Sequence, residues 1–184
     1  MNWNFSTANF SLRLPDASQD GDALYELLSQ PKVMAHIPKA SMSVSAQALD
    51  ELRRVAMRFE VRESACWLVE GAFDKRLIAR VGIQKINWMT DSAQFWWELS
   101  DTVDFSVLAE VVPALMNFCF DELKLNRLEM RLVADSEQSQ QPHEQYLKNI
   151  GFQYEGCLPA QQEFEGRSVD LMLYSFLAQD RHQH

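Results

Sequence analysis

Three consecutive apolar runs suited to β-strands, at residues 65–73, 77–86 and 93–99, constrain the fold of this chain most strongly. Short polar segments separate them, which favours an antiparallel succession of strands. An amphipathic helix over 106–123 then leads to an alternating strand at 128–133. Because a helix that joins two strands usually connects a parallel pair, we expect a mixed sheet.

The rest of the chain extends this arrangement at both ends. Further elements are expected as a strand at 10–14, two helical regions of which the second covers 41–62, a helix at 141–149, and strands at 152–154 and 170–177. The predicted fold class is α/β of the α+β type, with a central mixed, mostly antiparallel sheet flanked by helices on both faces. A length of 184 residues suits one domain over 1–184, with a core at about 10–177.

Composition excludes several classes of protein. Hydrophobic residues make up 47% of the chain and charged residues 23%, which is usual for a soluble globular domain. No run of 18 apolar residues occurs, so no membrane partner is expected, and we expect no signal peptide. The cysteines Cys66, Cys119 and Cys157 lack metal-binding spacing. This pattern predicts a reducing, cytoplasmic location and no bound metal, with Cys66 and Cys119 packed as small hydrophobes.

The net charge of −9 indicates what the chain can bind. Nucleic-acid binding requires a basic surface, so no nucleic-acid partner is expected. An acidic chain is compatible with basic partners such as amines or lysine-rich protein tails, including a basic protein N-terminus. The charge also serves solubility, and that explanation alone is sufficient.

Several short motifs occur in an order and spacing that resemble one family. The segment YLKNIGF at 146–152 is followed by Glu155 and Gly156. The other motifs are Leu12-Arg13-Leu14, Pro31-x-Val33, Arg127-Leu128-Glu129, and an ending with Gly166, Asp170 and Tyr174-Ser175. Together they resemble the GNAT acetyltransferase superfamily and its ribosomal-protein N-acetyltransferase (RimJ/RimL-like) branch. The resemblance covers about residues 10–177.

This resemblance implies an acetyl-CoA-dependent N-acetyltransferase. Its acceptor would be an amine, either a protein N-terminus or a small amine, which attacks the thioester directly. Backbone groups of the third strand, around Trp97 and Leu99, would bind the pantetheine arm. The loop that opens the central helix would bind the pyrophosphate through glycines and a basic residue. The corresponding positions in this chain are Asp104, Phe105, Ser106 and Val107.

That loop departs from the family pattern. Residues 100–108 read SDTVDFSVL and contain no glycine, lysine or arginine. Phe105 and Val107 lie near positions where the family uses glycine, and Asp104 lies near the basic position. One interpretation is that Asp101, Asp104 or Ser106 caps the helix. A compatible second interpretation is that coenzyme A binds weakly or not at all, which leaves a non-catalytic protein that binds a partner or ligand in the former coenzyme cleft.

A third hypothesis keeps enzymatic activity with a different donor site. It invokes another acyl donor, or a compensating phosphate contact from Arg80, Lys124 or Lys148.

Pro113 lies inside the predicted central helix and is expected to kink it.

Four side chains are candidates for acid–base catalysis. Glu98 is a candidate base, with a solvent-facing strand carboxylate as the alternative. In this branch an Asn-x-x-Ser motif follows the RLEA strand, and two alignments place its serine at Ser139 or at His143; a surface loop is the alternative for both. Tyr146 is a candidate acid for the leaving thiolate, or a packed aromatic residue, because related proteins place their tyrosine one position later.

The remaining expectations concern the acceptor side and assembly. Trp96 and Trp97 are adjacent in a strand and therefore face opposite sides of the sheet, so one should enter the core. The other is expected to line the acceptor groove, as Trp88 and Trp67 also could. His36 follows the first helix, in a region that the resemblance links to acceptor contacts, but a lone loop histidine is usually solvated and His36 is expected to be so. The resemblance allows a homodimer, although no apolar stripe stands out as an interface, and it does not identify the acceptor.

Overall fold

The computed structural model describes the backbone of residues 2–134 and 137–182 and the side chains of residues 2–134 and 142–181. One eight-stranded sheet runs in the order β1-β2-β3-β4-β5-β6-β8-β7. Its only parallel pair in the described chain is β5–β6, and all other neighbours are antiparallel. The strands are β1 Phe5–Ser6, β2 Phe10–Arg13, β3 Ala65–Gly71, β4 Leu77–Asn87, β5 Ser92–Leu99, β6 Arg127–Val133, β7 Gln153–Phe164 and β8 Arg167–Leu177.

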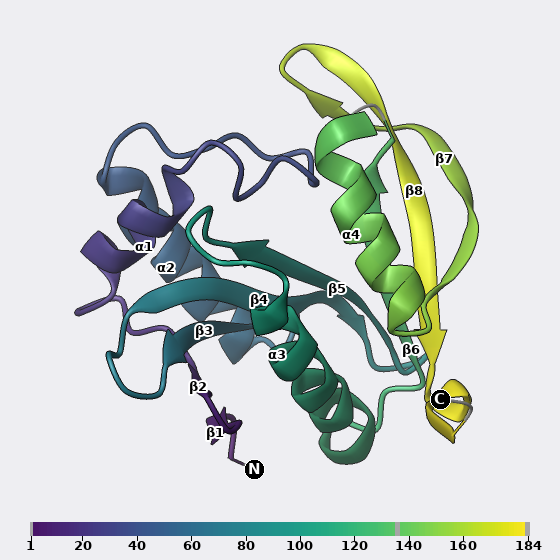
Figure 1. Cartoon of the computed structure of the whole chain (residues 1–184), viewed down its shortest axis with the longest axis horizontal. Coiled ribbons are helices and arrows are strands. Elements are labelled where there is room, and N and C mark those ends of the chain that lie inside the picture. Colours follow the sequence, from purple (N-terminus) through teal and green to yellow (C-terminus); the bar gives the residue numbers. More distant parts are fainter. Residues whose placement is uncertain (1, 135–136, 183–184) are drawn as a thin grey trace.

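Helices cover both faces of this sheet (Figure 1). The helices are α1 Gly21–Leu28, α2 Ala46–Glu60, α3 Ser106–Asn117 and α4 Glu137–Asn149. A π-helical turn, Phe118–Glu122, follows α3, and a 3-10 turn, Ala178–His182, ends the described chain. Helices α3 and α4 lie on one face, and α2 lies on the other with α1 beside it. None of the helices in the described ranges has the length and apolar character needed to cross a bilayer.

Strand alternation divides the core between the two faces. Trp67 and Trp97 are fully buried and pack with Leu108 and Val111 of α3. Leu68, the residue after Trp67 in β3, points to the opposite face and packs with α1 and α2. Because successive side chains of a β-strand point to opposite faces, each strand contributes alternate residues to the two hydrophobic layers.

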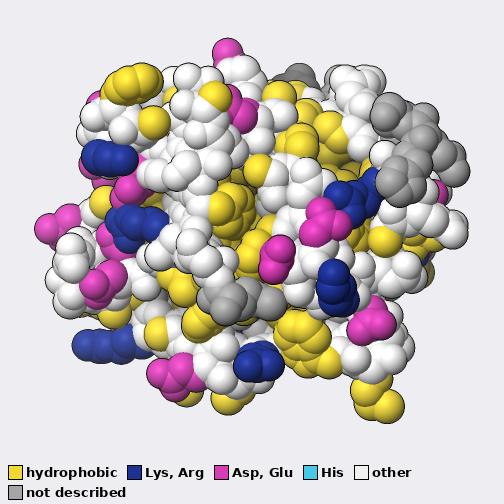
Figure 2. Space-filling view, turned by 90° about the horizontal axis from the view of Figure 1, so that it is seen from below, with side chains coloured by type: hydrophobic (Ala, Val, Ile, Leu, Met, Phe, Trp, Pro, Cys, Tyr) yellow, Lys and Arg dark blue, Asp and Glu magenta, His cyan; other side chains and the backbone are white. Residues whose placement is uncertain are grey.

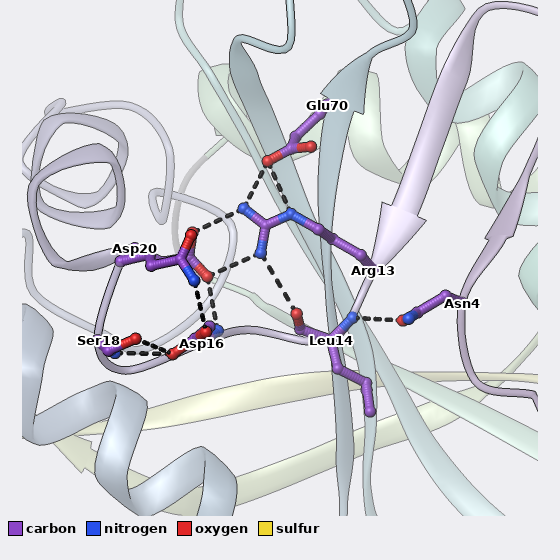
Figure 3. Close-up of polar contacts among 8 residues, drawn as sticks. Asn4, Arg13, Leu14, Asp16, Ser18, Asp20 and Glu70 are labelled. Atoms are coloured by element: carbon purple, nitrogen blue, oxygen red, sulfur yellow. Dashed lines mark hydrogen bonds and ion pairs between the residues drawn. The ribbon is translucent and has the colours of Figure 1, made fainter.

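A partly buried ion-pair group fixes the start of α1 against β2 and β3. Arg13 of β2 donates hydrogen bonds to both carboxylate oxygens of Asp20, the residue before α1, and to Glu70 of β3 (Figure 3). Burial of the Asp20 carboxyl would raise its pKa, but the bonds from Arg13 and from the Asp16 N–H hold that pKa below its usual value. The entry of the chain into α1 is thus set by charge-assisted bonds in addition to apolar packing.

The predicted mixed, mostly antiparallel sheet is confirmed, while several boundaries differ. The second helix begins at Ala46 instead of 41, and the central helix gives way to a π-helical turn after Asn117, with Pro113 inside the α-helical part. The predicted strand at 152–154 is the start of a twelve-residue edge strand, β7. Most of its residues are exposed, so no alternation of apolar and polar residues marks its length. Cys66 and Cys119 are buried, as predicted.

Candidate active site

The sheet opens between β5 and β6. These parallel strands pair only where Ser92–Gln94 lies beside Arg127–Glu129. From Phe95 to Leu99, β5 continues to pair with β4 but no longer with β6. The β6 side of this part of β5 is therefore free for contacts with groups that are not strands. Helix α3 begins on one side of the opening, and α4 lies over β6 on the other (Figure 1).

His36 bridges the two diverging strands from the loop between α1 and α2. Its Nε2–H donates a hydrogen bond of 2.9 Å to the Trp97 carbonyl oxygen, and its own carbonyl accepts the Val133 N–H at 3.1 Å. The expectation of a solvated His36 is wrong, because the side chain is fully buried. Its Nδ1 has no hydrogen-bond partner among the described residues. The imidazole thus occupies the opening beside the β5 backbone.

His143 of α4 stacks directly on His36. The two ring centroids lie 3.8 Å apart with an interplanar angle of 13°. His143 Nδ1 accepts a 2.9 Å hydrogen bond from the indole Nε1–H of Trp97. Burial lowers the pKa of His36 to about 4, against the opposite influence of the Trp97 carbonyl and Glu98. Burial and the neighbouring His36 lower the pKa of His143 to about 2. Both imidazoles are therefore neutral at physiological pH.

Two aromatic residues complete this cluster on the α3 and α4 side. The Tyr146 hydroxyl donates a 2.7 Å hydrogen bond to the Leu108 carbonyl oxygen in the first turns of α3. Burial raises the pKa of Tyr146 above its usual value. The half-buried ring of Phe105 meets the His143 ring edge-on at 4.9 Å and the Tyr146 ring at 5.7 Å. Tyr146 is packed and bonded in this arrangement, and Phe105 covers the cluster from the helix entrance.

The N-terminus of α3 carries a carboxylate of its own. The Asp104 Oδ1 accepts the Ser106 N–H at 2.8 Å, and hydrogen bonds from the Ser106 hydroxyl and N–H lower the pKa of the exposed Asp104 carboxyl. Upstream, the Asp101 carboxylate accepts the Lys32 N–H at 3.3 Å. Of the other predicted coenzyme contacts, Leu99 and Val107 are buried and Ser106 is exposed. Among the four loop positions, Asp104 and Ser106 are the two that face solvent.

A cavity of about 410 Å³ lies on the opposite, α2-side face of β4, β5 and β6. Trp96 lines it, while Trp97 is in the core, so the predicted division of the two tryptophans is confirmed. Trp67 belongs to the α3-side core, and Trp88 is partly exposed and bonds the Arg62 carbonyl oxygen. The cavity has the size of a small-molecule site.

Glu98 lies in this cavity within a buried ionic network. Its carboxylate accepts hydrogen bonds from Arg80 Nε at 2.7 Å and from Lys39 Nζ at 3.1 Å. Arg80 also donates to Glu51 of α2 at 3.0 Å. Burial opposes ionisation of Glu98, but Arg80 and Lys39 more than offset it and lower its pKa. The alternative of a solvent-facing Glu98 is wrong, because only 1% of its side chain is exposed.

Sequence reasoning missed the cavity network and the histidine bridge. Arg80 stands directly opposite Glu98 in the β4–β5 register, so a charge pair on neighbouring strands was a detectable signal.

Arg80, a candidate for a compensating phosphate contact, lies on the face away from α3, where it pairs with Glu98 and Glu51. Lys148 pairs with Glu144. The candidate Ser139 lies in the α4 range, and its side chain is outside the described residues.

Comparison with known proteins gives one family. The acetyltransferase (GNAT) domain family matches residues 9–153. An N-acetyltransferase named p20 from Bacillus licheniformis is 23% identical over 164 residues, which cover 88% of this chain and 89% of that protein.

Solved structures share the fold over nearly the whole chain. A probable acetyltransferase of the GNAT family from Chromobacterium violaceum superposes with a TM-score of 0.84 at 19% identity, covering 97% of this chain and 88% of that one. RimL, the ribosomal L7/L12 alpha-N-protein acetyltransferase, in complex with coenzyme A, gives 0.79 at 14% identity, covering 93% and 95%. The family model matches most of this chain, and the sheet opens between β5 and β6. The chain therefore belongs to the GNAT acetyltransferase family.

Proposed function

We propose that this protein is an acetyl-CoA-dependent N-acetyltransferase whose amine acceptor enters the cavity on the α2 side of the sheet. The observation that carries this proposal is the divergence of β5 from β6 after Gln94, next to a cavity that includes Trp96 and Glu98 of the same strand. A donor on one side and an acceptor on the other would meet at residues 96–98. Relatives with this fold include an enzyme solved with coenzyme A and enzymes that acetylate ribosomal proteins.

The backbone edge of β5 fits the pantetheine part of the coenzyme. Beyond Gln94 this edge has no strand partner, and amide groups of a pantetheine arm can pair with backbone groups around Trp97 and Leu99 other than the Trp97 carbonyl oxygen, which accepts the His36 hydrogen bond. The unpartnered, buried Nδ1 of His36 lies in the same opening and could accept one further hydrogen bond. When bound there, acetyl-CoA supplies an acetyl group activated as a thioester.

The entrance of α3 fits the pyrophosphate part poorly. The Asp104 carboxylate already accepts the first helical N–H, at the position where a helix N-terminus would bind a phosphate. No lysine or arginine occurs between Ser100 and Leu108. We therefore assign no catalytic step to contacts with the phosphates.

Glu98 is best assigned a positioning role in this reaction. Arg80 and Lys39 keep its carboxylate ionised and reduce its affinity for a proton, which makes it a weak general base. The same contacts hold Arg80 and Lys39 at the floor of the acceptor cavity. Backbone N–H groups of β5 near Trp97 would stabilise the developing oxyanion. Tyr146 would hold α4 to α3 through Leu108, and His143 would orient the Trp97 indole.

A second candidate function is supported by specific observations. His36, His143 and Phe105 fill the opening on the donor side, and Asp104 places negative charge at the mouth of α3. These features favour a non-catalytic protein that binds a ligand in the acceptor cavity alone.

An acetyl-transfer assay separates the two. The full chain is incubated with acetyl-CoA and a panel of primary amines, and products are identified by mass spectrometry against a heat-denatured sample. We expect an acetylated amine above the uncatalysed rate. Equal amounts in both samples for every amine would favour the second candidate.

A further inference from the structure

The acceptor cavity concentrates positive charge in an acidic protein. Six cationic side chains and two carboxylates line it, on a chain whose net charge is −9. The cations are Lys39, Arg54, Arg58, Arg80, Lys85 and Arg131, and the carboxylates are Glu51 and Glu98. On the face shown in Figure 2, basic and acidic side chains lie interspersed among hydrophobic ones.

The two carboxylates are neutralised within the cavity wall. Glu98 binds Arg80 and Lys39, and Glu51 binds Arg80, Lys39 and Arg54 at 3.0 to 3.4 Å. The pKa of Glu51 falls to about 2, since Arg80 and Lys39 outweigh the effect of burial. Neither carboxylate is therefore a free anion that could attract an ammonium group from solution.

Three cations remain without a carboxylate from the cavity lining. Arg58 and Lys85 are exposed and take part in no ion pair or side-chain hydrogen bond among the described residues. Arg131 shares Glu129, outside the cavity lining, with Arg127. Arg131 Nε is buried without a partner in the described structure, and so is Nη1 of Arg80. Buried guanidinium donors of this kind usually bond an anion or a polar ligand group.

These charges determine which amine can enter. A cleft lined by six cations and only two carboxylates, in which Arg58 and Lys85 have no ion-pair partner among the described residues, focuses a positive potential that repels a simple ammonium ion and attracts an anion. We infer that the acceptor is an amine that also carries an anionic group, a carboxylate or a phosphate, which binds the cationic side chains of Arg58, Lys85 and Arg131 in the cavity lining. Its amine then lies toward Trp96 and Glu98. The inference rests on the proposed function, and it reverses the expectation of a basic partner drawn from net charge.

Binding of matched amines without any coenzyme tests the inference. The probes are 4-aminobutyrate against 4-aminobutan-1-ol, O-phosphoethanolamine against ethanolamine, and alanyl-glutamate amide against alanyl-glutamine amide. Calorimetric titration of the full chain should show the anionic member of at least one pair binding ten times more tightly or better, which corresponds to about 1.4 kcal/mol. The pair with the largest ratio distinguishes a carboxylate, a phosphate and an acidic peptide as the source of the anion.

Variants localise the effect. Lys85→Gln and Arg58→Gln should each reduce the preference at least threefold, and high salt should reduce it further. The control is Arg53→Gln, an exposed arginine of the same helix as Arg58 that lies outside the cavity lining. Its preference should equal that of the wild type.

Three results would overturn the inference: equal binding within all pairs, binding of no probe, or a preference that both cavity variants retain. A separate acetyl-CoA titration keeps the two proposals apart. If acetyl-CoA binds and no anionic preference exists, the enzyme function stands and the acceptor class is wrong. If the preference exists and acetyl-CoA does not bind, the cavity is an anion-selective amine site in a protein without the enzyme function.

Discussion

The Nε2–H of His36 donates a 2.9 Å hydrogen bond to the Trp97 carbonyl oxygen, on the part of β5 that no longer pairs with β6. The contact joins the loop between α1 and α2 to the opening between β5 and β6. The imidazole thus occupies one hydrogen-bonding group of the β5 edge. This relationship places a neutral, buried imidazole pair at the centre of the site, with consequences for stability against pH.

Acidification should destabilise the protein earlier than its carboxylates require. The pKa values of His36 and His143 in the folded state, about 4 and about 2, lie below the ordinary 6.5. The unfolded chain therefore binds more protons below pH 6.5, and stability falls as the pH decreases from there toward pH 4. We expect the two histidines together to cost about 3 kcal/mol of unfolding free energy between pH 6.5 and roughly pH 5, in urea-unfolding experiments. The Glu98 charge raises the pKa of His36 and so partly opposes the lowering of that pKa by burial.

His143→Gln provides the matched comparison for this pH dependence. The variant removes one titrating group, so its stability should change less steeply over the same range, whatever its stability at neutral pH. The lowered pKa values of Glu51 and Glu98 act only at lower pH and do not interfere. A wild-type stability that is constant between pH 7 and roughly pH 5 would contradict the neutral imidazole stack.

Breaking the buried ion pair of Glu98 should be costly. Glu98→Leu leaves Arg80 buried without its nearest carboxylate, and we expect a loss of about 3 kcal/mol in unfolding free energy. The double variant Glu98→Leu, Arg80→Met should recover part of that loss because no uncompensated charge remains. Losses that simply add would show that the two residues do not form an interacting pair.

Tyr146→Phe tests whether Tyr146 acts in packing or in catalysis. Loss of its 2.7 Å hydrogen bond to the Leu108 carbonyl oxygen should reduce stability by about 1 kcal/mol. The control Tyr154→Phe changes an exposed tyrosine and should have little effect. We predict that acetyl transfer, measured as thiol release, changes less than threefold in both variants. A large decrease in kcat with unchanged stability would identify Tyr146 as the acid instead.

Asp104→Arg tests the acidic entrance of α3. Replacing the carboxylate at the N-terminus of α3 with a guanidinium should tighten acetyl-CoA binding roughly three- to tenfold at low salt, and less at high salt. The control Asp22→Arg makes the same charge change at an exposed position in the first turn of α1. Equal affinities in the two variants would dismiss Asp104 as the cause of weak binding.

Local periodicity was sufficient to predict the sheet but not the site. The runs at 65–73, 77–86 and 93–99 predict β3, β4 and β5, because their side chains alternate or are continuously apolar. The length of β7 could not be predicted, since a polar edge strand is held by its pairing with β8 alone.

The site depends on contacts between distant residues. His36 is buried by Trp97, 61 residues away, and Glu98 by Arg80 on the next strand. A lone histidine or a strand carboxylate is usually solvated, so the burial of both follows only from the three-dimensional structure. The loop before α3 was more informative, because its missing glycines and basic residues are a property of the sequence itself.

Titration of the full wild-type chain with acetyl-CoA tests the proposed enzyme function most directly. We predict saturable calorimetric binding in the micromolar range with one site per chain, and a matching rise in thermal stability, because a ligand that binds the folded state alone raises apparent stability. No heat of binding and no thermal shift at millimolar acetyl-CoA, for a sample that is folded by circular dichroism, would contradict it.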